Sequence, residues 1–379
     1  MSAGKLSKSK WLYFFIGVLA ILIILFVSFA PRAHYTRAYI EENRGKVIVE
    51  IPEVFELANI IIAIANHELT NNPYSVFQQG EYYERVLQHF LPFKNHPLIS
   101  EIRREFSGED QGSKYYRFRD NSVCYVFKGD SIVNAGLYSV VFSPDLFKEY
   151  IDLVEDFARV SGFREFYDAN QSYYQEQIQK YKERVPVKKM WDWLENNFPQ
   201  RYDCYKVIFS PLIQGMHHTE RFETKKFKEI VMFICGPDAF HVRLPEKIEE
   251  GLLSRAVFTE IDHNYVNPIT KKYSDKVEKA FSDIQKWNKQ SRYWYTTPVI
   301  TFNEYMTWAV FTLYAYDTYE KEDFEIINQF TVNQMVNSRG FVLFEQFNNQ
   351  LLELYINREE GEAIPDLYPE ILEWVENYL

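Results

Sequence analysis

The sequence predicts an α+β fold in which helices dominate, with a small sheet and one membrane-spanning helix at the N-terminus. Three observations support this prediction: a run of twenty uncharged residues near the start, a few short segments with strand-like alternation, and many longer segments with helical periodicity. With 379 residues, the chain is long enough to bury a substantial core.

The composition excludes some classes of function. A net charge of −11 argues against a nucleic-acid partner, because phosphate binding needs clustered Lys and Arg. The three cysteines are widely spaced, which disfavours a thiolate zinc cluster and leaves buried free thiols or one disulfide. Aromatic residues make up 17% of the chain, which predicts thick aromatic packing, or grooves that face a peptide or carbohydrate.

The N-terminal apolar run spans residues 11–30 and contains no charge. As a helix it would be about 30 Å long, the thickness of a bilayer core. Lys5, Lys8 and Lys10 precede it, as expected for a cytoplasmic tail of residues 1–10. The sequence therefore predicts an inner-membrane signal anchor with the rest of the chain exported to the periplasm; a cleaved signal peptide is the alternative.

A polar tether over residues 31–44 and a single exported domain over residues 45–379 are expected to follow. Alternation from Val47 to Ile51 predicts a strand, and Pro52 then begins an apolar helix. The remaining expectations before residue 200 are helices over 82–106 and 145–198, the second broken near Gly162 and Pro186, and strands over 123–127 and 132–142.

A hairpin is predicted from two apolar segments, 205–212 and 228–235, and we expect it to form the edge of a cleft. His217 and His218 lie between the two segments. In extended backbone their side chains point to opposite sides, so at most one of them readily faces a given site. The two histidines are candidate ligands for a metal or a substrate; the alternative is two exposed loop residues.

The segment over residues 245–267 is predicted to be a helix that ends at Asn267-Pro268. It contains Thr259-Glu260-Ile261-Asp262-His263, which differs by one residue from the His-Glu-x-x-His motif of zinc peptidases. In that motif the two imidazoles bind zinc and the glutamate activates water. Glu260 and His263 occupy the positions of the glutamate and the second histidine, but Thr259 replaces the first. The alternative is a buried Glu–His pair without metal.

A second apolar helix is predicted from Thr301, with Thr301 as its N-cap and Glu304 in the capping-box position. Glu304 is thus explained as a cap. It is also a candidate third zinc ligand, since one class of zinc peptidases takes a glutamate from a second helix that follows the motif.

Several segments together resemble an uncharacterised bacterial domain-of-unknown-function family, numbered four-nine-three-two, whose helix reads His-Glu-Phe-x-His-x-x-x-Asn-Pro. The resemblance covers most of residues 45–320 and lies in VEIPEVFELAN, YYQEQ, VIFSPL, EIDHNYVNP and FNEYMTWAVF. It implies a zincin-like metallopeptidase fold, with Glu260 activating water and with His263 and Glu304 binding zinc. Thr259 departs from the family pattern at the first ligand.

These observations predict a membrane-anchored, zincin-like metallopeptidase that acts on a peptide. Its zinc would be held by His263, Glu304 and either His217 or His218, with Glu260 as the general base. The alternative is a non-catalytic envelope protein that kept the fold and binds a peptide or a glycan in an aromatic cleft. A third possibility is a structural partner in a membrane complex, which would show a large exposed apolar patch.

Overall fold

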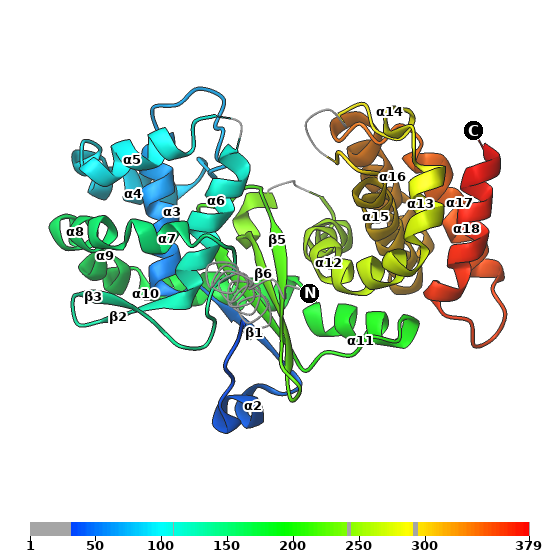
Figure 1. Ribbon diagram of the computed structural model, residues 1–379, viewed down its shortest axis with the longest axis horizontal. Helices are drawn as coiled ribbons and strands as arrows, with labels where there is room; N and C mark the ends of the chain where they lie inside the picture. The colour runs from blue at the N-terminus through cyan, green and yellow to red at the C-terminus, as the bar shows by residue number, and fades with distance from the viewer. Residues whose placement is uncertain (1–31, 109, 241–243, 291–294, 379) are drawn as a thin grey trace, which may run out of the picture.

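The computed structural model describes residues 32–108, 110–240, 244–290 and 295–378 (Figure 1). Its main sheet has the strand order β1-β4-β6-β5. Strands β1 (Lys46–Glu50), β4 (Cys204–Ser210) and β6 (Lys228–Cys235) are parallel, and β5 (His218–Glu223) runs antiparallel to β6 at one edge. A separate two-stranded ladder pairs β2 (Tyr125–Lys128) with β3 (Ser131–Asn134).

The burial of the strands explains their order in the sheet. Every residue of β4 is buried, as is nearly every residue of β6, which is typical of parallel strands covered on both faces. Strand β5 is only partly buried, as expected of an edge strand. The predicted hairpin of residues 205–212 with 228–235 is therefore wrong: these two segments pair in parallel, and the hairpin is formed by β5 and β6.

The helices from α3 to α10 lie on one side of the sheet, whereas α11 lies beside α12 on the other side (Figure 1). Helix α3 is buried along almost its whole length, because its residues are apolar on every side. Gly162 ends α8 in the left-handed conformation with φ of +63°, as glycine permits. The elements are α3 (Glu53–Asn66), α4 (Glu81–Phe90), η1 (Leu91–Phe93), α5 (Pro97–Glu105), α6 (Gln111–Arg119), η2 (Asp120–Cys124), α7 (Leu146–Glu149), α8 (Ile151–Ser161), α9 (Phe163–Ala169), α10 (Gln171–Arg184) and α11 (Val187–Asn197).

The helices after β6 form the other side of the molecule, with α12 next to β5 (Figure 1). Helix α15 is buried through most of its length and packs against α12, α16 and α17. The elements are η3 (Pro237–Phe240), α12 (Glu246–Thr270), η4 (Lys271–Tyr273), α13 (Ser274–Ala280), α14 (Ile284–Trp287), α15 (Pro298–Thr318), α16 (Lys321–Asn333), the π-helical turn η5 (Gln334–Ser338), α17 (Phe344–Asn357), η6 (Ile364–Leu367) and α18 (Tyr368–Tyr378).

The part of the expected tether that the structure describes packs against the sheet. Helix α2 (Arg37–Asn43) begins with Thr36 as its N-cap, and Ala33 forms a bridge with Tyr138. Tyr35 and Tyr39 donate hydrogen bonds to the buried Glu229 on β6, at 3.0 and 2.7 Å. Residues 32–44 are thus anchored by specific contacts and do not form a loose linker.

The fold-class prediction, a helix-dominated zincin-like fold preceded by a membrane-spanning helix, has to be corrected. The described residues form a helix-rich α+β fold with a small sheet, but none of their helices is long and apolar enough to cross a membrane. The predicted anchor, residues 11–30, lies outside the described residues. The expectation of buried free thiols is confirmed for Cys124, Cys204 and Cys235.

Candidate functional site

A pocket with a volume of about 1040 Å³ lies between the sheet edge and the C-terminal helices. One wall is the loop before β5 together with the start of that strand, and the opposite wall is formed by α12, α15 and the turn η5. The volume is at the upper end of what is usual for small-molecule sites, so the pocket has room for several residues of a peptide. All five residues that the sequence indicated as a site line it: His217, His218, Glu260, His263 and Glu304.

Helix α12 presents one face to this pocket. Arg255, Thr259 and His263 are four residues apart, which places their side chains one above the other, and Glu260 lies beside them. The helix does not end at Asn267 as predicted. Pro268 is tolerated inside it, and the helix continues to Thr270.

Thr259, at the position of the missing histidine, uses its hydroxyl within its own helix. Its Oγ1 donates to the carbonyl oxygen of Arg255 at 3.0 Å, a common arrangement for a threonine inside a helix. A neutral hydroxyl is also a much poorer zinc ligand than imidazole, thiolate or carboxylate. Thr259 therefore does not replace the first ligand.

Glu260 lines the pocket and forms no side-chain hydrogen bond or ion pair with the other described residues. Burial raises the pKa of its carboxyl above the ordinary value, and the Glu304 carboxylate raises it further. His263, His218 and Arg339 act in the opposite direction. A glutamate carboxylate without a fixed partner can accept a hydrogen bond from a ligand, and its protonated form can also donate one.

His263 and Glu304 do come together. The Nε2 of His263 lies 3.5 Å from Oε1 of Glu304, and its Nδ1 lies 3.3 Å from Oδ1 of Asn267. Both side chains are largely shielded from solvent. The structure thus brings these two residues together, although they are 41 positions apart in the sequence, in the helices α12 and α15.

Glu304 is not the cap of its helix. Helix α15 begins at Pro298, and its N-cap is Thr297, whose Oγ1 accepts a hydrogen bond from the Ile300 amide at 3.3 Å. The sequence placed the N-cap four residues too late, at Thr301. Glu304 therefore sits in the second turn, where Nη2 of Arg339 donates to its Oε2 at 2.6 Å. The predicted capping box is wrong.

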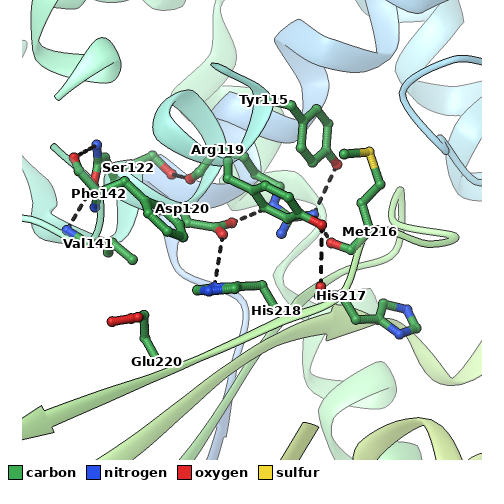
Figure 2. Close-up of polar contacts among 12 residues, drawn as sticks. Tyr115, Arg119, Asp120, Ser122, Val141, Phe142, Met216, His217, His218 and Glu220 are labelled. Carbon is green, nitrogen blue, oxygen red and sulfur yellow. Dashed lines mark hydrogen bonds and ion pairs between the residues drawn. The ribbon is translucent and has the colours of Figure 1, made fainter. Parts of the chain in front are cut away.

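The two histidines before and at the start of β5 point in different directions (Figure 2). His218 faces Asp120, with its Nδ1 3.5 Å from Oδ2, while His217 turns away from that carboxylate. Asp120 is fully buried and also forms an ion pair with Nε of Arg119 at 2.6 Å. These contacts hold His218 against the N-terminal half of the chain.

His217 has a different environment. Its Nε2 is buried and has no hydrogen-bond partner among the described residues. Burial, together with Arg119 and Arg339, lowers the pKa of the ring to about 4, so the imidazole is neutral near pH 7. It could act as a donor or an acceptor towards a ligand.

These residues do not fit zinc in the arrangement that the sequence predicted. Within the described ranges, no three His, Cys, Asp or Glu side chains are grouped so that they could hold a metal ion. The carboxylate of Glu304 is already neutralised by the guanidinium of Arg339 at its Oε2, and this cation would repel a metal bound at the same carboxylate. A zinc role for these residues therefore remains an untested prediction, and no chemical step is derived from it.

Sequence reasoning missed the residues that dominate the far wall of the pocket. Arg255, Trp308 and Arg339 all line it, as does Tyr295, whose hydroxyl interacts with Arg339. Two of them could have been found from spacing, because Arg255 is four residues before Thr259 and Trp308 four after Glu304. Arg339 follows a π-helical turn in another segment and gives no local signal.

Comparison of the chain with protein-family models, with curated proteins and with solved structures gave no match in any of the three cases. The resemblance to an uncharacterised family therefore stays a prediction.

Proposed function

We propose that this protein binds an extended peptide in the pocket between β5 and α12, without zinc and without hydrolysing it. The observation that supports this most directly is the contact between Arg339 and Glu304. In the predicted peptidase site, a metal would neutralise Glu304. Here a guanidinium does so at 2.6 Å, and the adjacent Thr259 offers no ligand.

A peptide suits this pocket better than a compact ligand. Strand β5 is the edge of the sheet and begins at the pocket, and a sheet edge can pair with an added extended chain through main-chain hydrogen bonds. The aromatic residues Tyr116, Tyr295 and Trp308 supply apolar surface for side chains of the ligand. His217 and Glu260 supply polar groups without fixed partners.

The proposal is tested by measuring zinc content and peptide binding in the same preparation. We expect the purified chain to contain no stoichiometric zinc and to retain synthetic peptides equally well with and without a chelator. About one zinc per chain, lost together with binding in His263→Ala, would overturn the metal-free part. Retention of oligosaccharides with no retention of peptides would show that the ligand is a glycan.

A converse variant sharpens the test. The double substitution Thr259→His with Arg339→Met restores the missing imidazole and removes the competing cation. We expect it to gain zinc that the parent chain does not bind, and we expect Thr259→His alone to gain less. Zinc in the parent equal to that in the double variant would contradict the proposed role of Arg339.

One observation favours a second function, that of a zinc hydrolase. Two ligands of a tetrahedral zinc lie about 3.4 Å apart when each bond is about 2.1 Å. Nε2 of His263 and Oε1 of Glu304 are 3.5 Å apart, which matches that spacing. The zinc measurement above separates the two functions, because the hydrolase needs the metal and the peptide-binding protein does not.

A further inference from the structure

Two guanidinium groups pack against one indole in the wall of the pocket. The Cζ atoms of Arg339 and Arg255 lie 4.6 and 5.2 Å from the centre of the Trp308 ring. The three residues come from the end of the π-helical turn, from α12 and from α15. Such contacts between a cation and an aromatic ring fix the orientation of a guanidinium plane and leave its N–H edge free to bind.

The two arginines differ in their partners. Arg339 forms an ion pair with Glu304 and interacts with the Tyr295 hydroxyl. Arg255 donates to Oγ1 of Thr331 at 3.2 Å and to Oε1 of Gln334 at 2.5 Å, and both of these acceptors are neutral. Among the described residues, no carboxylate lies within ion-pair distance of Arg255.

An unpaired cation inside a pocket is unfavourable, because burial removes the water that would stabilise the charge. The effect is visible in the protonation of Arg255. Burial, with a smaller contribution from the positive charge of Arg339, lowers the pKa of its guanidinium to about 10. An anion bound at this position would supply the missing counter-charge.

The surrounding charges favour a singly charged, planar anion. Glu304 is neutralised by Arg339, and Glu249, also on the pocket wall, forms an ion pair with Arg184. Arg255 therefore carries the uncompensated positive charge of this wall, and a single negative charge on a ligand would balance it. A carboxylate fits, since a guanidinium binds its two oxygens in parallel.

We propose that Arg255, held against Trp308, is the subsite for a carboxylate of the bound peptide. This inference depends on the proposed function and specifies the class of peptide that the pocket selects. The carboxylate can be the C-terminus of the peptide or an Asp or Glu side chain. Phe330, 40% exposed, and Leu252 line the same pocket and provide apolar contact for a neighbouring side chain.

The test uses a pool of synthetic hexapeptides, each prepared with a free C-terminal acid and with a C-terminal amide. Peptides retained by the full chain are identified after ultrafiltration, and their dissociation constants are measured by calorimetry. We expect retained peptides to lose about 30-fold or more in affinity when their carboxylate is removed, the usual scale for losing one partner of a buried charge pair. Loss on amidation indicates the C-terminus, and loss on Glu→Gln exchange in the peptide indicates a side chain.

Variants of the protein complete the test. Arg255→Gln is expected to bind acid and amide equally weakly, and Arg255→Lys to recover part of the preference, because lysine keeps the charge but not the paired N–H groups. Arg164→Gln is the matched control. Arg164 also stacks on an aromatic ring, at 5.0 Å from Phe127, and pairs with Glu53, but it does not line the pocket.

The outcomes separate the two proposals. Failure of the unmodified chain to retain any peptide would overturn the proposed function and this inference with it. The carboxylate subsite alone would be overturned if peptides bind and their dissociation constants do not change. This must hold both when their carboxylates are removed and when the protein carries Arg255→Gln. Thermal melting of each variant checks that a change in affinity does not result from unfolding.

Discussion

A cluster around Glu229 and the pocket around Glu260 lie near opposite ends of the sheet, and their carboxylates differ in how well their oxygens are satisfied. Glu229, near the start of β6, accepts hydrogen bonds from the hydroxyls of Tyr35, Tyr39 and Tyr138 at 2.6 to 3.0 Å. At the pocket, Glu260 has no side-chain partner among the described residues, and neither does the fully buried Asp262 on the same helix.

The difference distinguishes structural carboxylates from those available for binding. The first cluster joins residues 32–44, the β2–β3 region and β6, and burial together with Glu229 raises the pKa values of Tyr35 and Tyr39, which keeps them as neutral donors. Both oxygens of Glu229 thus accept hydrogen bonds from within the fold. The pocket, in contrast, holds unpaired groups of both signs, which favour binding because a ligand can satisfy them.

The largest expected effect is on stability, in the satisfied cluster. Glu229→Ala leaves three buried hydroxyls without their acceptor, and we expect it to lower the free energy of unfolding by about 3 to 5 kcal/mol. Urea denaturation followed by circular dichroism measures the loss. Glu229→Gln keeps one acceptor oxygen and should lose less, while peptide binding by either folded variant should be unchanged.

A loss below about 1 kcal/mol for Glu229→Ala would mean that the tyrosines find other acceptors, and the contrast between the two clusters would then be weaker than the geometry indicates.

The next effect concerns the ion pair that stands where a metal was predicted. Arg339→Met leaves Glu304 without its counter-charge. We expect a loss of about 1 to 3 kcal/mol, less than for a fully buried pair because both groups retain some exposure to the pocket. The double variant with Glu304→Gln should recover part of this loss, because neither charge is then unpaired. Additive losses in the double-mutant cycle would show that the two residues are not coupled.

A smaller effect is expected in the pH dependence of stability. Burial raises the pKa of Asp262 well above its ordinary value of 3.8, and Glu260 and Glu304 raise it further. The folded chain therefore binds this proton more tightly than the unfolded chain does. Stability from this group is fully present below pH 4 and is lost as the pH rises towards the raised pKa.

Asp262→Asn should remove that loss. We expect the stability of the variant relative to the unmodified chain to increase from pH 4 to pH 8, as measured by urea denaturation at each pH. Glu260→Gln should change in the same direction, because burial also raises the pKa of Glu260. Parallel stability curves for Asp262→Asn and the unmodified chain would show that Asp262 has a partner in solution.

The sequence predicted most of the elements because their signals are local. The strand over Val47–Ile51 and the helix after Pro52 follow from alternation and from proline at a helix start, and both are present as β1 and α3. The pairing of β4 with β6 could not be read in the same way. Whether two apolar strands pair in parallel depends on the position of the intervening strand β5 in the sheet. That position is not encoded in the residues next to either strand.

The same limit applies to the site. The motif helix located Glu260 and His263, a second apolar helix located Glu304, and the segment before β5 located His217 and His218, so five pocket residues followed from sequence. The prediction of zinc assumed that the space beside Glu304 was free. Arg339 occupies it from a segment 35 positions further on, and the packing of α15 against α16, which continues into η5, brings it there.

The smallest expected effect tests whether Arg255 is free for a ligand. If its partners are only the neutral Thr331 and Gln334, Arg255→Gln should change the free energy of unfolding by less than about 1 kcal/mol, since no carboxylate is left unpaired. The comparison is Arg119→Gln, which leaves the buried carboxylate of Asp120 without its counter-charge. We expect this variant to lower the free energy of unfolding by about 3 kcal/mol or more. Equal losses in the two variants would mean that Arg255 is a structural residue like Arg119. The charge of its guanidinium would then already be balanced within the fold, and the pocket would resemble the Glu229 cluster in this respect.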